Sequence, residues 1–143
     1  MPFRFHDELS SADVAFEAWG ATQEELFIAS ASALLRTMVA APEEVVRQQQ
    51  LTIRLEDKEL DMLLWAFLQE LIFYKDARRL LLHAETVRIE EGDGIFRLKA
   101  QVSGEEIATA RHHCLVDVKA VTLHCFGVVY EDGFWKAVVV LDV

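Results

Sequence analysis

The chain has 143 residues, of which 52% are hydrophobic, and a formal net charge of −10. This length favours one domain, residues 1–143, with a proper core, and the composition excludes a disordered chain. The charge argues against direct, tight nucleic-acid binding, because phosphate contacts need clustered Lys and Arg. No apolar run approaches the ~20 residues of a membrane span, and the N-terminus lacks a secretory signal. We therefore expect a cytoplasmic protein without membrane contacts.

The first half of the sequence predicts two strands and two helices. Residues 13–19 alternate as a short strand that Gly20 ends, and the spacing of Thr22 and Glu25 is that of a capping box. The expected elements are a helix over 23–39, a strand over 45–55 and a second helix over 58–75, with Asp57 as its N-cap. The second helix is apolar around most of its girth, so its aromatic residues, Phe73 included, are expected in the core.

The second half of the sequence is predicted to be mostly β-structure. Glycine-containing turns at residues 91–94 and 131–133 separate apolar runs, a strong hairpin signal, and residues 103–106 are expected to form another turn. The expected extended segments cover residues 86–90, 95–102, 107–117, 121–130 and 134–141. The predicted class is α+β, a largely antiparallel sheet with two long helices packed on one side.

The last predicted strand ends in two acidic groups. Asp142 and the main-chain carboxylate of Val143 follow a nearly continuous apolar run. An isolated buried carboxylate is costly. These groups therefore form either a solvated strand end or part of a site.

The two cysteines, Cys114 and Cys125, form no CxxC pair. Buried free thiols are the favoured interpretation, because nothing else in the sequence indicates an oxidising compartment. His112 and Cys114 share one face of an extended segment, which gives only a weak indication of a metal site.

Several stretches, taken in order, resemble the archease family over nearly the whole chain. Their order and spacing make the match specific. They are Ser11-Ala-Asp-Val14, Trp19-Gly-Ala-Thr-Gln-Glu-Glu-Leu-Phe27, Leu63-Leu-Trp-Ala-Phe-Leu-Gln-Glu-Leu-Ile72, Gly104-Glu105, Arg111-His112, Val118-Lys-Ala-Val-Thr122, His124 and Val140-Leu-Asp-Val143.

The resemblance implies a function that composition does not reveal. Archeases are accessory proteins of the RNA ligase that joins 2′,3′-cyclic phosphate or 3′-phosphate ends to a 5′-hydroxyl in tRNA splicing and RNA repair. They promote guanylylation of the ligase and its multiple turnover, and they are not themselves the ligase.

The resemblance also implies a metal site. The matching positions are Asp13 and Asp142, with the carboxylate of Val143. These hard oxygen donors suit Ca²⁺, Mg²⁺ or Mn²⁺. Ser10 stands where family members usually carry His. The alternative is that Asp13 caps a turn and that Asp142 is a solvated strand end.

Four further residues are candidates for contacts with a partner or for activation. Lys119 is either an exposed edge lysine or a partner to the carboxylates or to a nucleotide phosphate. Glu70 is either a polar residue of the second helix or a member of the acidic cluster. His124 is expected to pack within a strand, and Arg111 is a weaker candidate.

Two other function classes remain open from the sequence. One is a small metal-dependent phosphohydrolase that uses the same carboxylates, although the sequence lacks a nucleophile–base pair and a phosphate-binding glycine loop. The other is a general chaperone-like interaction module.

Overall fold

The computed structural model describes residues 2–6 and 13–143. Two long helices and eight strands follow one another along these residues. In chain order they are β1 (Phe3–His6), β2 (Asp13–Gly20), α1 (Gln23–Met38), the 3₁₀ turn η1 (Pro42–Glu44), β3 (Gln49–Asp57), α2 (Leu60–Arg78), β4 (Leu80–Gly92), β5 (Ile95–Glu106), β6 (Ala120–Val121), β7 (Gly127–Glu131) and β8 (Phe134–Asp142).

The strands form two antiparallel sheets. In the larger sheet β8 pairs with β2 on one edge and with both β6 and β7 on the other, and β1 pairs with β2. The smaller sheet has the order β3-β5-β4. The predicted α+β class, the antiparallel pairing and the two long helices are confirmed, and the structure adds that the strands divide between two sheets.

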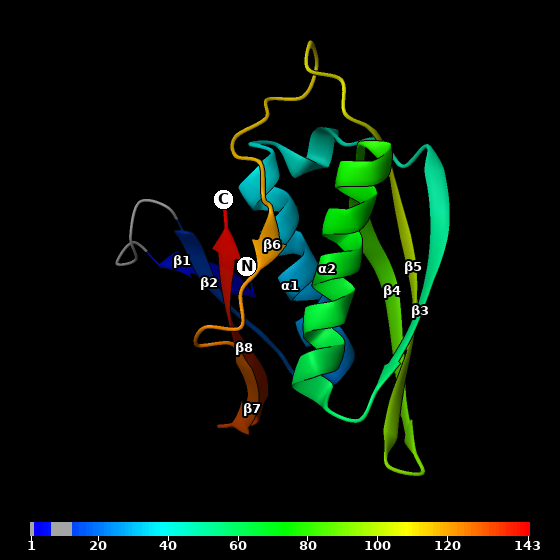
Figure 1. Ribbon diagram of the computed structural model, residues 1–143, viewed down its shortest axis with the longest axis vertical. Coiled ribbons are helices and arrows are strands. Elements are labelled where there is room, and N and C mark those ends of the chain that lie inside the picture. Colours follow the sequence, from blue (N-terminus) through cyan, green and yellow to red (C-terminus); the bar gives the residue numbers. More distant parts are fainter. Residues whose placement is uncertain (1, 7–12) are drawn as a thin grey trace.

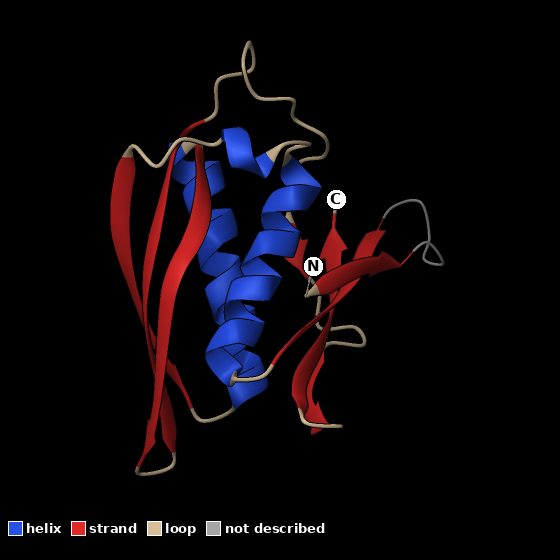
Figure 2. Ribbon diagram, turned by 180° about the vertical axis from the view of Figure 1, so that it is seen from behind, coloured by secondary structure: helices blue, strands red, loops and turns tan. Residues whose placement is uncertain are grey.

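Both helices lie between the two sheets (Figures 1 and 2). One cluster of buried side chains joins them to both sheets, including Phe16 and Val139 on one side and Ile53 and Leu98 on the other. The nearly all-round apolar surface of α2 explains this arrangement, because a helix of that kind must be covered on more than one face.

The helix ends follow the capping rules in part. Thr22 caps α1: its Oγ1 accepts a hydrogen bond from the Glu25 N–H at 3.1 Å, and Glu25 in turn accepts from the Ala21 N–H at 2.8 Å. The predicted N-cap of α2 was wrong. Glu59 occupies that position without a side-chain cap, and Asp57 accepts instead from the Glu59 N–H at 3.0 Å.

Both predicted hairpin turns are confirmed. The loops between β4 and β5 and between β7 and β8 each have two residues, Asp93-Gly94 and Asp132-Gly133. All four have positive φ, from 55° to 82°. This conformation matches the right-handed twist of the flanking strands, and Asp-Gly pairs adopt it readily.

Three expectations for the second half were wrong. Residues 103–106 do not turn but continue β5, where Ser103 and Glu105 are buried. Residues 107–117 form an irregular loop rather than a strand. The strand expected at 121–130 is split into β6 and β7, and Cys125, with a φ of +56°, lies in the break.

Three side chains expected in the core are exposed. Cys114 and Cys125 are free thiols, as predicted, but both are exposed, because they lie in loops rather than in buried strands. Phe73 is 54% exposed on α2, whereas Phe67 is fully buried and stacks on Phe27. Among the described residues, no helix combines the length and hydrophobicity that crossing a membrane requires.

Gly104 is needed because β5 and β4 approach closely there. A Cβ atom at this position would lie 1.7 Å from the carbonyl oxygen of Leu81. We predict that Gly104→Ala lowers the free energy of unfolding by about 1–3 kcal/mol or more, because the backbone must move to admit the methyl group. Urea denaturation measures this. Gly92→Ala is the matched control, since a Cβ there meets nothing within 4 Å; equal losses in the two variants would contradict the steric explanation.

Candidate functional site

The pairing of β2 with β8 brings two distant aspartates together. Asp13 lies directly opposite Asp142 in the antiparallel register, at the end of β8 nearest the C-terminus (Figure 1). Directly opposed residues point to the same face of a sheet, with Cβ atoms about 4.5–5.5 Å apart. The pairing therefore brings together two of the residues that the family resemblance marks for a metal site.

The donor atoms at this strand end are suited to a hard divalent cation. Asp142 is exposed, and the last residue, Val143, follows it directly and is half-buried. Within the described residues, no group of three or more His, Cys, Asp and Glu side chains is close enough to hold a metal ion. Asp13 and Asp142 alone leave most coordination positions of such a cation open to backbone oxygens, water or groups from outside the chain.

A third segment meets the same strand end from the other side of β8. The Lys119 N–H donates to the Asp142 carbonyl at 2.8 Å, and Ala120 lies opposite Asp142 in the β6–β8 pair. The side chain of Lys119 is exposed. Lys119 thus brings a positive charge to the strand end that carries the two aspartates.

Thr122 supplies a further oxygen near this end. It continues the β6 register by donating its N–H to the Val140 carbonyl at 2.9 Å, so its side chain shares the face of Asp142 two pairs further along. Its hydroxyl oxygen is buried and has no hydrogen-bond partner among the described residues. A buried hydroxyl without a partner is uncommon, and it fits a site that an additional polar group completes.

Helix α2 holds β6 in place through two side chains one turn apart. Trp65 Nε1–H donates to the Val121 carbonyl at 2.9 Å, and the Val121 N–H donates to Gln69 Oε1 at 2.6 Å. Both backbone groups of Val121 are thus satisfied by the helix, as a neighbouring strand would satisfy them. This contact fixes the segment that carries Lys119.

Lys75 anchors the start of the same segment. Its buried ammonium donates to the Val118 carbonyl at 2.7 Å and pairs with Asp117 and Asp76 at 2.5 Å each. Burial lowers the pKa of Lys75, but the hydrogen bonds to Asp117 and Asp76 outweigh it and raise the pKa above its usual value. Lys75 is therefore a charged structural anchor.

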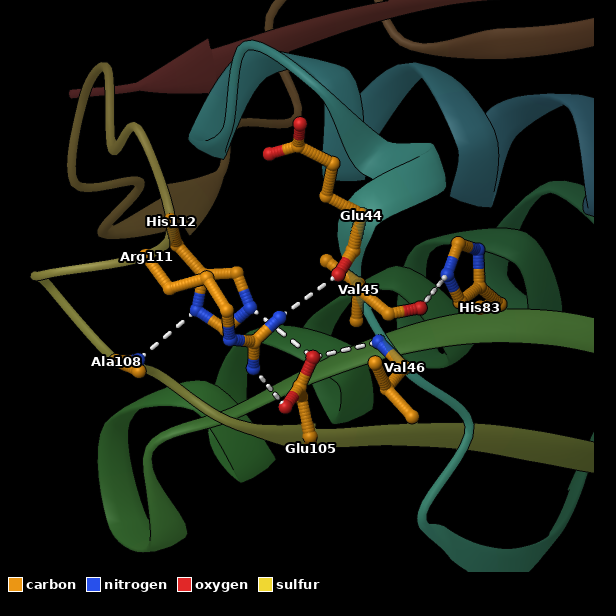
Figure 3. Close-up of polar contacts among 8 residues, drawn as sticks. All are labelled: Glu44, Val45, Val46, His83, Glu105, Ala108, Arg111 and His112. Atoms are coloured by element: carbon orange, nitrogen blue, oxygen red, sulfur yellow. Dashed lines mark hydrogen bonds and ion pairs between the residues drawn. The ribbon is translucent and has the colours of Figure 1, made fainter.

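A second polar cluster surrounds the buried side chain of Glu105 (Figure 3). Its Oε2 accepts from the Val46 N–H at 2.5 Å and lies 3.1 Å from His112 Nε2, while its Oε1 pairs with Arg111. Arg111 also donates to the Glu44 carbonyl at 3.0 Å. The cluster ties the end of β5 to the loop after it and to the segment that follows η1.

The hydrogen bonds of His112 define its tautomer. The Ala108 N–H donates to Nδ1 at 2.9 Å, so the ring proton lies on Nε2 and points to Glu105. Burial alone would raise the pKa of Glu105, but the hydrogen bonds from Val46, Arg111 and His112 lower it from 4.5 to about 2. Glu105 is thus a carboxylate held ionised in the interior.

The sequence model of the Archease protein family (MTH1598/TM1083) matches residues 3–143. The chain belongs to the archease family. Among its relatives, "Protein archease" of Methanothermobacter thermautotrophicus is 36% identical over 141 residues, covering 98% of this chain and 97% of the relative. "Protein archease" of Pyrococcus furiosus is 32% identical over 134 residues, covering 93% and 94%.

Solved structures agree with this membership. The solution structure of Methanobacterium thermoautotrophicum protein 1598 superposes with a TM-score of 0.86 at 33% identity, covering 99% of each chain. A Thermotoga maritima protein described as an archease and possible chaperone has a TM-score of 0.66 at 18% identity, covering 94% and 93%. The second likeness shows that the fold is shared.

Several of the archease-like stretches, which are far apart in the sequence, contact one another in the structure. Trp65 and Gln69 hold Val121, and Glu105 binds Arg111 and His112. Sequence reasoning missed Gln69, Lys75 and Glu105 as anchors. For Gln69 the available signal was a polar side chain in a largely apolar stretch, which becomes meaningful only when its partner is known. Lys75 and Glu105 have charged neighbours in the sequence, so no such signal marks them.

The remaining candidates lie in different settings. Arg111 pairs with the buried Glu105, so it has a structural role that its exposure alone would not reveal. His124 is exposed in the loop between β6 and β7 rather than packed in a strand. Glu70 is half-buried on α2, and no three-residue acidic group among the described residues includes it. Ser10 lies outside the described residues.

We predict that Glu105 makes the free energy of unfolding depend on acidity between about pH 4.5 and pH 2. Its pKa is lower in the folded chain than the ordinary 4.5, so its stabilising effect is complete above pH 4.5 and disappears as the pH falls toward 2. Urea denaturation across this range should show a smaller decrease for Glu105→Gln than for the parent. Glu106→Gln is the control at an exposed neighbour. A Glu105→Gln profile with the parent's full slope would contradict the prediction.

We predict that Gln69→Leu lowers the free energy of unfolding by about 1–3 kcal/mol, because the Val121 N–H loses its acceptor. Thermal and urea denaturation measure the loss. Glu70→Leu, at the adjacent half-buried position, is the matched control and should cost less. Equal effects at the two positions would show that Gln69 does not hold β6.

Proposed function

We propose that this archease is an accessory protein that activates an RNA ligase in tRNA splicing or RNA repair. In this role it promotes ligase guanylylation and multiple turnover without joining RNA itself. Membership of the family supports the general assignment. The observation that carries the specific proposal is the register that sets Asp13 opposite Asp142.

We infer that Asp13, Asp142 and the Val143 carboxylate hold a divalent cation, Ca²⁺, Mg²⁺ or Mn²⁺. Opposed carboxylates repel each other, and a cation between them removes the repulsion. When bound, the ion supplies positive charge that can contact phosphate or carboxylate oxygens. Asp142 is exposed, so the open side of the site faces outward and is accessible to a group of the partner.

The surrounding residues then position the site. Trp65, Gln69 and Lys75 fix the segment from Val118 to Val121 against α2. That segment keeps Lys119 beside Asp142, where its ammonium offsets the carboxylates or contacts a nucleotide phosphate on the partner. An exposed, incompletely ligated site at a rigid strand end suits an activator better than a self-contained hydrolase, whose site would also need a nucleophile–base pair.

We predict that Asp13→Asn or Asp142→Asn abolishes ligase stimulation and leaves the fold intact. The measurement is RNA end-joining by the cognate ligase over many turnovers, with and without the archease. Asp132→Asn is the matched control. It removes the same charge at the opposite end of β8, in a turn where Asn tolerates the positive φ of 55°.

A separate measurement tests the metal without the ligase. Mn²⁺ or Ca²⁺ should raise the melting temperature of the parent and of Asp132→Asn, but not of Asp13→Asn or Asp142→Asn. Without metal, Asp142→Asn should be as stable as the parent or slightly more stable, because one repelling charge is gone. Full stimulation by both site variants would overturn the proposed role of these residues. RNA joining by the archease alone would overturn the accessory role.

A further inference from the structure

The outer face of the smaller sheet carries a row of three cations, Arg54, Lys99 and Arg88, called here the basic row. Lys99 on the central strand β5 lies opposite Arg54 of β3 and opposite Arg88 of β4. All three are exposed. They alternate along their strands with residues of the core cluster such as Ile53 and Leu98, so they lie on the face opposite the one that the helices cover in Figure 1. Strands lie about 4.8 Å apart, so the row spans about 10 Å.

The basic row is positively charged, whereas the molecule as a whole is negatively charged. The chain has a formal net charge of −10, yet three like charges stand side by side, an arrangement that destabilises a sheet. Within the described residues, none of the three takes part in an ion pair of 4 Å or less, whereas the neighbouring Arg97 pairs with Glu56 at 3.5 Å. Sequence inspection does not reveal the row, because its members come from three separate stretches.

The basic row lies in a hollow of about 440 Å³. Besides Arg54, Lys99 and Arg88, the hollow is lined by the charged Arg97, Glu56 and Glu90 and by the apolar Leu55 and Leu98. Glu56 and Glu90 lie on either side of Arg97 in the next row of the sheet. This volume falls within the range of small-ligand sites.

We propose that this hollow binds a small ligand that carries two or three adjoining phosphate groups. Guanidinium and ammonium groups in a row supply several charge-assisted hydrogen bonds to phosphate oxygens. Glu56 and Glu90 limit the anionic part of the ligand to the basic row, and they accept hydrogen bonds from hydroxyl or amino groups elsewhere on it.

A long RNA backbone fits the hollow less well than a small ligand. Its phosphates would extend past the basic row, toward the two glutamates or over a surface that is negative overall. The proposal concerns a face built from β3, β5 and β4, whereas the carboxylate site lies on β2 and β8. It therefore does not depend on the proposed ligase activation.

Calorimetric titration with pyrophosphate and tripolyphosphate, without divalent metal, tests the proposal. The parent should bind both saturably and tighter than inorganic phosphate. Lys99→Gln should weaken binding by about tenfold or more, because a hydrogen bond to a charged group contributes on this scale. Arg36→Gln is the matched control: it removes one exposed positive charge on α1, away from this face, and should bind like the parent.

A second readout keeps the test independent of folding defects. At low salt Lys99→Gln should melt at or above the parent's temperature, since repulsion in the basic row falls. Tripolyphosphate should raise the melting temperature of the parent and of Arg36→Gln by similar amounts, and that of Lys99→Gln by less. Equal binding by Lys99→Gln and the parent would overturn the site. Saturable binding of a single-stranded RNA oligonucleotide that pyrophosphate cannot displace would overturn the assignment to a small ligand.

Discussion

The candidate metal site depends on the register between β2 and β8. A slip of one residue would turn every side chain of one strand to the other face. Asp13 would then no longer share a face with Asp142, and Phe16 or Val139 would leave the core in which both are fully buried. The same β2–β8 register is therefore required both for the packing that stabilises the fold and for the alignment of the two carboxylates. Hydrophobic burial on the inner face of the larger sheet determines where the acidic groups lie on its outer face.

Helix α2 extends this constraint to the other edge of β8. A two-residue strand such as β6 has little stability by itself, and its hydrogen bonds to Trp65 and Gln69 compensate for that. Lys75 adds a buried charged anchor at Val118. Replacing one partner of any of these hydrogen bonds destabilises the fold, because the other partner is then left as an unsatisfied polar group in the interior. The position of the exposed Lys119 is thus set by contacts that α2 makes with its neighbours Val118 and Val121.

The sequence predicted what local pattern and periodicity determine. The capping box at Thr22, both Asp-Gly hairpins and the two long helices follow from interactions within a few residues. The errors arose where distant partners decide the outcome. Residues 103–106 were predicted to turn because Ser, Gly and Glu are typical of exposed turns. The sequence does not show that His112 and Arg111 bind the Glu105 carboxylate and allow it to be buried in a strand. Cys125 was placed inside a strand because its sequence neighbours are largely apolar, whereas in the structure it lies between β6 and β7. The basic row depends on the register of three strands, so composition and local motifs gave no indication of it.

The long sequence separation between Asp13 and Asp142 also has a consequence for synthesis of the protein. Their pairing closes a loop that includes almost the whole chain, and both helices and the entire smaller sheet lie within that loop. Closing a long loop costs entropy, and contacts of this kind slow folding compared with local hairpins and helices. The β4–β5 hairpin and α1 can form while the chain is still growing on the ribosome. The aspartate pair cannot exist until the final strand has left the exit tunnel, so the carboxylate site is absent at every earlier stage of synthesis.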